Sequence, residues 1–67
     1  MSIANNLREL RQELGLSQKQ LAEQLDISQS AIARWELSKT EPTASALVII
    51  ANFFNITVGQ LVGTEEY

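Results

Sequence analysis

Apolar residues recur at helical spacing along most of the chain, and single polar residues mark the points where helices would begin. Serine and threonine are favoured at helix N-caps, because the hydroxyl accepts a hydrogen bond from a free N–H group of the first turn. Five such residues each precede an apolar-periodic stretch, namely Ser2, Ser17, Ser28, Thr43 and Thr57. No stretch alternates between apolar and polar positions over four or more residues between turn signals. The sequence therefore predicts an all-helical fold with five helices.

Further signals sharpen the predicted helix boundaries. Ser17 and Thr57 each stand three residues before a glutamine, which completes a capping box. Gly15 is expected to end the first helix and Asn55 the fourth, because both residue types tolerate the left-handed conformation at a helix end. We expect the fourth helix over about Ala44–Phe54. The inner faces of the first and fourth helices are predicted to carry Ile3, Leu7, Leu10, Leu14, Leu47, Ile50, Ala51 and Phe54.

The stretch from residue 17 to residue 37 has the pattern of two short helices that meet at a tight turn. Leu21, Ala22 and Leu25 share one helical face, and Ile32 and Trp35 repeat by three on the next helix. Such a corner leaves the second helix free to protrude. Its outward positions carry small residues, an amide and a guanidinium, which are groups suited to base edges in a DNA groove. These outward residues are Ser28, Gln29, Ser30, Ala33 and Arg34.

Length and composition limit what the chain can do. Its 67 residues make one small domain, which we expect over residues 1–62, followed by a loose tail at residues 63–67. Cysteine and histidine are both absent, so disulfides, thiolate metal sites and the usual zinc and acid–base chemistries are excluded. An enzyme, a bound metal and a cofactor are therefore not expected. No apolar run approaches the roughly 18 residues of a membrane span and no signal peptide is visible, so we expect a cytoplasmic protein.

Net charge opens an alternative. The chain has 5 basic and 8 acidic residues, a formal charge of -3, whereas proteins that bind DNA usually show a basic face. Glu65 and Glu66 lie in the expected tail, so residues 1–64 carry 5 positive and 6 negative charges, a net -1. The distribution of charge over the surface therefore matters more than the total. The acidity favours, as the alternative, a protein-interaction module of the same fold, such as an antitoxin that binds a basic partner protein.

Several motifs together resemble one protein family. They are LxxLRxxxGLSQxxLA at residues 7–22, IxxWE at residues 32–36, the following Lys39 and Pro42, and ITVGQL at residues 56–61. Over about Ile3 to Val62 the chain resembles the phage repressor and Cro-type (XRE-like) helix-turn-helix family. The resemblance implies a compact five-helix bundle of the lambda repressor-like type, in which helices 2 and 3 form the helix-turn-helix. It also implies a transcriptional regulator, acting as a repressor, that binds double-stranded DNA as a homodimer with residues 28–36 in the major groove.

The resemblance and the outward positions together give candidate DNA contacts. A glutamine amide can pair with adenine and an arginine can span two acceptors of guanine, so Gln29 and Arg34 rank first for specificity. The base-contacting candidates are Gln29, Ser30, Arg34, Ser28 and Ala33. Helix N-termini attract phosphates through free N–H groups and a partial positive charge. The candidates for contacts to the DNA backbone are Gln18, Ser17, Lys19, Lys39 and Thr40.

The resemblance also assigns residues away from the DNA face. Arg11 and Glu36 match a buried structural ion pair, so a substitution of Arg11 should act through folding. Asp26 and Ser38 stand where the family often has glycine, and both are expected to need a positive φ. The turn and the loop around these two residues are therefore where the chain departs from the family pattern.

The last helix and the aromatic residues complete the assignments. By the resemblance, the candidate dimer contacts are Val58, Gln60, Leu61 and Val62, and the alternative is that they only close the core. Aromatic residues at helical spacing are usually core anchors, so Trp35, Phe53 and Phe54 are expected in the core. The charged residues Arg8, Glu9 and Glu13 are expected on a solvated face of the first helix.

Overall fold

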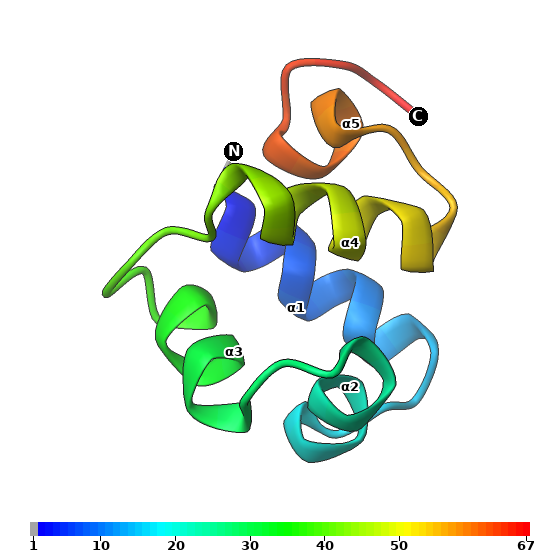
Figure 1. The fold of residues 1–67 in the computed structure, drawn as a ribbon. Helices are drawn as coiled ribbons and strands as arrows, with labels where there is room; N and C mark the ends of the chain where they lie inside the picture. Colours follow the sequence, from blue (N-terminus) through cyan, green and yellow to red (C-terminus); the bar gives the residue numbers. More distant parts are fainter. Residues whose placement is uncertain (1) are drawn as a thin grey trace.

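Five helices follow one another along the chain, as the sequence predicts. The computed structural model describes residues 2–67. Within them lie α1 (Ile3–Glu13), α2 (Gln18–Leu25), α3 (Gln29–Glu36), α4 (Ala44–Phe54) and α5 (Val58–Val62). Figure 1 shows α1 in the middle of the molecule, with α2 and α3 on one side of it and α4 and α5 on the other. The helix α1 contacts both α3 and α5, so it joins the two halves of the fold.

All five predicted N-caps form. Each serine or threonine hydroxyl accepts a hydrogen bond from the N–H group three residues further on, in Asn5, Gln20, Ala31, Ala46 and Gln60 respectively. The two capping boxes are also present, with Gln20 Oε1 2.8 Å from the Ser17 N–H and Gln60 Oε1 3.0 Å from the Thr57 N–H. Each cap typically stabilises a helix by about 1 kcal/mol. The short helices therefore begin at fixed residues.

Left-handed residues end the helices or follow them. Asp26 and Asn55 close α2 and α4 with φ of 55° and 57°, and Gly63 closes α5 with φ of 90°. Gly15 and Ser38 stand two residues beyond α1 and α3, with φ of 70° and 58°. The positive φ expected at Asp26 and Ser38 is thus present. At Asp26 and Asn55 the connection to the next helix is only three residues long, over residues 26–28 and 55–57.

The core receives one completely buried aliphatic side chain from every helix. These are Leu7, Leu21, Ile32, Ile50 and Leu61, each 0% exposed. Trp35 is buried with them, and Phe53 and Phe54 pack against the core as an edge-to-face pair with ring centroids 5.1 Å apart. The expected core role of the three aromatic residues is therefore confirmed.

Two apolar residues differ from the expectation. Leu14 was predicted on the inner face of the first helix, but α1 ends at Glu13 and the Leu14 side chain is 57% exposed. Leu61 was predicted to contact a second protomer, but its side chain is 0% exposed because it fills the space between α5 and the rest of the core. The prediction of Leu61 as a dimer contact is therefore wrong, and the alternative holds for this residue.

Residues 63–67 are exposed but fold back against α5. The Gly59 carbonyl oxygen accepts hydrogen bonds from the backbone N–H groups of residues 63, 64 and 65. Thr57 Oγ1 donates to the carboxylate of Glu65, and Gln60 Nε2 donates to the carbonyl oxygen of Glu66 at 3.1 Å. The end of the described chain is therefore hydrogen-bonded to α5 and to its N-cap. None of the helices in residues 2–67 has the length and apolar character needed to cross a membrane.

Candidate nucleic-acid interface

The corner between α2 and α3 follows from local features of the sequence. Asp26 is left-handed, which ends α2 and allows the Ile27 N–H to donate to the Ala22 carbonyl oxygen at 3.0 Å. Ser28 then begins α3 at once. Ala22 is buried, and its small side chain allows α2 and α3 to pack closely. The corner therefore holds α3 rigidly while it leaves one side of that helix open.

The open side of α3 carries the residues predicted to meet base edges. Gln29, Ser30 and Arg34 are exposed, and Ala33 is half-buried. Ser28 is exposed as well, but its hydroxyl already accepts a hydrogen bond from the Ala31 N–H at 3.2 Å. The structure thus brings the base-contacting candidates together on one surface of one short helix.

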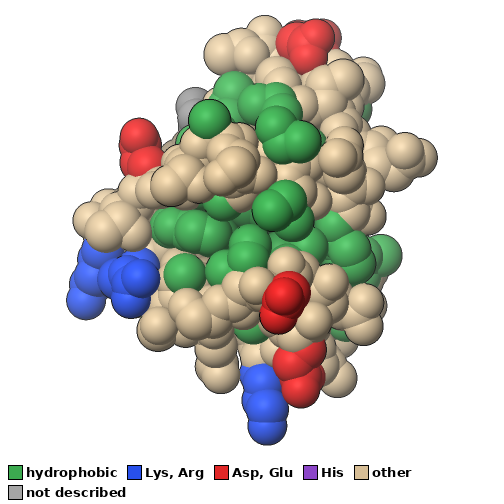
Figure 2. Space-filling view, viewed as in Figure 1, with side chains coloured by type: hydrophobic (Ala, Val, Ile, Leu, Met, Phe, Trp, Pro, Cys, Tyr) green, Lys and Arg blue, Asp and Glu red, His purple; other side chains and the backbone are tan. Residues whose placement is uncertain are grey.

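The candidates for phosphate contacts lie on both sides of α3. Ser17 and Lys19 are exposed at the start of α2, and Lys39 and Thr40 are exposed in the loop after α3. This loop takes its path from the left-handed Ser38, after which the Lys39 N–H donates to the Arg34 carbonyl oxygen at 2.9 Å. Figure 2 shows Lys and Arg side chains beside α3 and its following loop, and again beside α2. Gln18 differs from these candidates because its side chain is half-buried.

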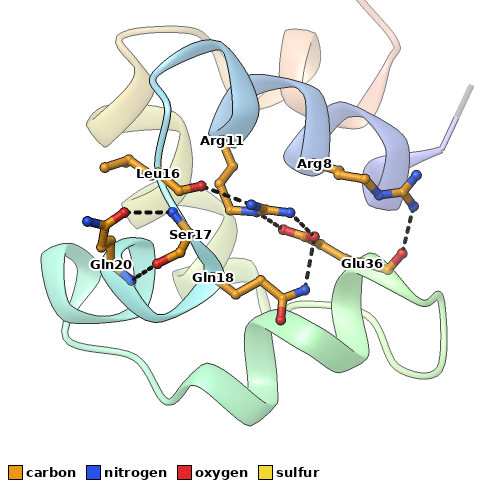
Figure 3. Close-up of polar contacts among 7 residues, drawn as sticks. All are labelled: Arg8, Arg11, Leu16, Ser17, Gln18, Gln20 and Glu36. Atoms are coloured by element: carbon orange, nitrogen blue, oxygen red, sulfur yellow. Dashed lines mark hydrogen bonds and ion pairs between the residues drawn. The ribbon is translucent and has the colours of Figure 1, made fainter.

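Behind the surface lies a polar cluster centred on Glu36, the last residue of α3. Arg11 binds the Glu36 carboxylate through two nitrogens, with Nε 2.7 Å from Oε2 and Nη2 2.9 Å from Oε1. Gln18 Nε2 also donates to Oε1, at 3.1 Å. The Arg8 guanidinium donates to the main-chain oxygen of Glu36 at 3.0 Å, and Arg11 Nη1 donates to the Leu16 carbonyl oxygen at 2.9 Å. Figure 3 shows how this cluster connects α1, the start of α2 and the end of α3.

The Arg11–Glu36 pair is largely withdrawn from water. The side chains are 13% and 3% exposed. The hydrogen bond from Arg11 to Glu36 raises the pKa of Arg11, against the opposing effect of burial. A cation whose pKa is raised on folding loses its stabilising effect only when the pH rises through that pKa. Because the pKa of Arg11 lies far in the alkaline range, Arg11 stays charged at neutral and acidic pH.

Two residues of the cluster have roles that sequence reasoning missed. Arg8 was expected on a solvated face, but it is half-buried and binds the end of α3. The expectation of a solvated Arg8 is therefore wrong. A signal was available, because Arg8 stands three residues before Arg11 and shares its side of the helix. The link from Gln18 to Glu36 had no comparable signal.

The cluster changes the charge available to an anionic partner. Because Arg8 and Arg11 face inward, the remaining basic residues are Lys19, Arg34 and Lys39, and all three are exposed. All the acidic residues except Glu36 are exposed, which leaves 8 minus 1, or 7, negative charges on the surface. Arg34 lies on α3, Lys39 lies in the loop that follows it, and Lys19 lies at the start of α2.

The last helix presents less apolar surface than the sequence suggested. Val58 is 36% exposed. Gln60 and Val62 are half-buried, and the Gln60 amide is engaged with the Thr57 N–H and the Glu66 carbonyl oxygen. Of the four candidate dimer contacts, three therefore remain accessible in part.

Comparison with known proteins gives one family. A family model described as "Helix-turn-helix" matches residues 7–61. The chain is 41% identical over 66 residues to the HTH-type transcriptional activator BcrR of Enterococcus faecalis, which covers 98% of this chain and 32% of that protein. It is 34% identical over 65 residues to the Immunity repressor protein of Bacillus phage phi105, which covers 97% of this chain and 45% of that protein. The chain thus spans 32% and 45% of the length of these two curated relatives.

Solved structures give the same fold. The P22 c2 repressor protein, in a crystal structure with a synthetic operator, superimposes with a TM-score of 0.88 at 25% identity, over 97% of this chain and 98% of that chain. A transcriptional regulator from Listeria innocua superimposes with a TM-score of 0.87 at 30% identity, over 98% of this chain and 62% of that chain. The predicted lambda repressor-like five-helix fold is therefore confirmed.

Proposed function

Because this chain belongs to the helix-turn-helix family, we propose that it is a sequence-specific regulator of transcription that reads operator half-sites with α3 in the major groove of double-stranded DNA. The observation that carries the proposal is the exposed face of α3. Within residues 2–67, the base-reading groups of Gln29, Ser30 and Arg34 have no partner apart from one contact between the hydroxyls of Ser28 and Ser30 at 3.4 Å. Amides and guanidinium groups are the side chains that distinguish bases in the major groove.

Contacts to the DNA backbone would fix the position of α3. The N-termini of α2 and α3 each offer unpaired N–H groups and a partial positive charge, which together favour phosphate binding. Lys19 lies at the N-terminus of α2, and Lys39 and Thr40 follow the C-terminus of α3. Ser17 caps α2 and can accompany Lys19. Gln18 belongs to the same set, because its amide nitrogen carries two N–H groups and the bond to Glu36 uses one of them.

Repression by occupancy fits a domain of this size. A repressor of this kind needs only to cover an operator, and a single small domain can supply that. The relatives include one protein named as an activator and one named as a repressor, so their names do not distinguish the two outcomes. The P22 c2 repressor protein, whose solved chain matches this chain over 98% of its length, is named a repressor, which supports repression.

A homodimer would give such a regulator enough contacts. One small domain covers few base pairs, and helix-turn-helix dimers place two recognition helices about 34 Å apart on successive turns of DNA. Val58 is the most exposed apolar residue of α5, with Gln60 and Val62 beside it. We assign the dimer contact to these three residues.

The surface charge supports a second candidate function. Three exposed cations against seven exposed carboxylates would suit a protein-interaction module that binds a basic partner, such as an antitoxin. Such a module would select no particular duplex sequence. The position of the cations on α3, in the loop after it and at the start of α2 favours the DNA reader.

Two alanine variants test the roles assigned around α3. On the duplex that the protein prefers, Arg34→Ala should weaken binding by about 1–3 kcal/mol and relax the preference at one base pair, because it removes a base contact. Lys39→Ala should weaken binding to all sequences alike, because phosphate contacts carry no sequence information. Equal losses on every sequence for both variants, measured by fluorescence anisotropy, would contradict the assignment.

A further inference from the structure

We propose that Arg8 is a positioning residue for the DNA backbone contacts: it closes the C-terminal end of α3 and thereby fixes the loop that presents Lys39 and Thr40. The inference rests on the proposed DNA-binding function. Arg8 lies on α1, half-buried, and its Nη2 donates to the main-chain oxygen of Glu36 at 3.0 Å. Figure 3 shows Arg8 and Arg11 reaching Glu36 from the same helix, Arg11 at the carboxylate and Arg8 at the main chain.

The bond from Arg8 completes the hydrogen bonding at the end of α3. The last four carbonyl groups of a helix have no partner inside it, so the surrounding structure must supply one. At the end of α3, three of the four accept from backbone N–H groups of the following residues. Leu37 donates to Ala33 at 3.1 Å, Ser38 to Trp35 at 3.1 Å, and Lys39 to Arg34 at 2.9 Å. Within residues 2–67, the Glu36 main-chain oxygen accepts only from Arg8.

The positive charge of Arg8 suits this position. The C-terminal end of a helix carries a partial negative charge, so a cation beside it is stabilising. A hydrogen bond from a charged donor is also roughly twice as strong as one between neutral groups. Because α3 has only eight residues, its own hydrogen bonds give its end little support. The end of α3 therefore depends on the contact that α1 supplies.

The contact with Arg8 acts on the loop because the peptide group that contains the Glu36 oxygen also begins that loop. A peptide group is planar, so a hydrogen bond to its oxygen restrains the direction in which the chain continues. Ser38 then turns the chain with φ of 58°, and Lys39 and Thr40 follow with exposed side chains. A change in this peptide plane would swing both side chains away from the phosphates that they are proposed to contact.

The Arg8 guanidinium keeps donors for other partners. It carries five N–H groups, and the bond to Glu36 uses one of them. Arg8 can therefore bind a phosphate directly as well. The two roles differ in one respect: a direct contact is independent of the loop, whereas positioning acts only through Lys39 and Thr40. Removal of these two side chains distinguishes the roles.

Arg8→Met removes the bond without leaving a buried charge alone. Glu36 keeps its two-point contact with Arg11, and methionine retains an unbranched stem that can pack where the arginine stem lies. We therefore expect the variant to fold. Gln12→Met is the matched control, because Gln12 is an exposed residue of the same helix, one turn further on.

The first test measures the affinity for the duplex that the wild-type protein prefers, in two backgrounds. In the wild-type background, Arg8→Met should weaken binding by roughly three- to tenfold, the range that one lost hydrogen bond spans. In a protein that also carries Lys39→Ala and Thr40→Ala, the same change should weaken binding by less than about twofold, because coupled residues are not additive. Gln12→Met should leave the affinity unchanged. An equal loss in both backgrounds would overturn the proposal, since a direct phosphate contact or a general loss of stability gives that pattern.

The second test needs no DNA and separates this inference from the proposed function. In hydrogen exchange of the free protein followed by NMR, Arg8→Met should speed exchange of the Ser38 and Lys39 N–H groups. The Ile56 N–H, which donates to Ala51 in the same way after α4, serves as the internal reference and should not change. Unchanged exchange at Ser38 and Lys39 would overturn the proposal even if DNA binding were established. A wild-type protein that prefers no duplex sequence would overturn the proposed function, and faster exchange would then still support the closure of α3 by Arg8.

Discussion

Glu36 joins the recognition helix to the rest of the domain at the level of single residues. Its carboxylate accepts from Arg11 and Gln18, and its main-chain oxygen accepts from Arg8. A buried carboxylate is tolerated only when it is paired and fully hydrogen-bonded. Among the described residues, every buried side-chain nitrogen or oxygen has a partner. The three donors are unequal, however, because only Arg11 neutralises the charge of the Glu36 side chain.

The first prediction concerns this charge. Arg11→Met should lower the free energy of unfolding by about 3–5 kcal/mol, because it leaves the Glu36 carboxylate buried without a countercharge. Urea unfolding followed by circular dichroism measures the change. Arg34→Met serves as the control, since Arg34 is exposed and its loss should change stability by no more than about 0.5 kcal/mol. An Arg11→Met protein that unfolds at the wild-type urea concentration would show that the pair is not structural.

The roles of residues could be predicted from the sequence where they depend on close neighbours in the chain. The five N-caps depend on groups three residues apart, so local sequence predicts them. The Arg11–Glu36 pair came from family resemblance. The contact of Gln18 with Glu36 spans 18 residues, and no local rule reports such a separation. For Arg8 the spacing to Arg11 indicated the side of the helix, but not its partner 28 residues away. Whether the exposed residues of α3 contact bases stays a prediction.

At the scale of helices, left-handed residues control where each element stops. Asp26, Ser38 and Asn55 occupy this region although they carry side chains. Aspartate and asparagine tolerate it through local hydrogen bonds, but serine has less compensation. Ser38 also sets the path of the loop that carries Lys39 and Thr40. The strain at Ser38 is therefore stored next to the proposed phosphate contacts.

The second prediction tests this strain. Ser38→Gly should stabilise the protein by about 0.5–1 kcal/mol, since a left-handed non-glycine residue costs about 1–2 kcal/mol and glycine adds a smaller entropy cost. Gln24→Gly, at an exposed position inside α2, should instead destabilise it by about 0.5–1 kcal/mol. Melting temperatures from calorimetry give both values. A Ser38→Gly variant that melts below the wild type would contradict the strain argument.

The boundaries of helices were easier to predict than the surroundings of their side chains. Caps, capping boxes and left-handed ends are encoded within a few residues, so all five helices appear where they were expected. Leu14 and Leu61 show what local patterns leave out. Leu14 follows the apolar spacing but lies beyond the end of α1, and Leu61 is enclosed by helices distant in sequence.

At the scale of the whole molecule, the arrangement of charge bears more on function than the net value of -3. Two of the five basic residues are used inside the fold, and the other three lie near α3. Of the seven exposed carboxylates, Asp26 lies just before α3 and Glu41 in the loop after it, and the other five lie on α1, on α2 and in the tail. A small number of phosphate contacts must therefore be supplemented by backbone N–H groups at helix N-termini.

The third prediction follows from this count. With three exposed cations, the slope of log affinity against log salt should be no steeper than about -2.7 for each protomer, because each neutralised phosphate contributes about -0.9. Titrations of a labelled duplex at several salt concentrations measure the slope. Lys39→Ala should make it shallower by about 0.9. A slope much steeper than this limit would mean that Arg8 or Arg11 leaves Glu36 to bind DNA.

Selection of binding sequences from a random duplex library at moderate salt tests directly whether α3 reads DNA sequence. We expect an enriched inverted repeat whose half-site centres lie about 10 base pairs apart, as for two copies of α3 in successive major grooves. Such a result would support both the reading of sequence by α3 and the dimer through α5. Recovery of no preferred sequence from protein shown to be folded would contradict the proposed function and favour a module that binds a protein partner.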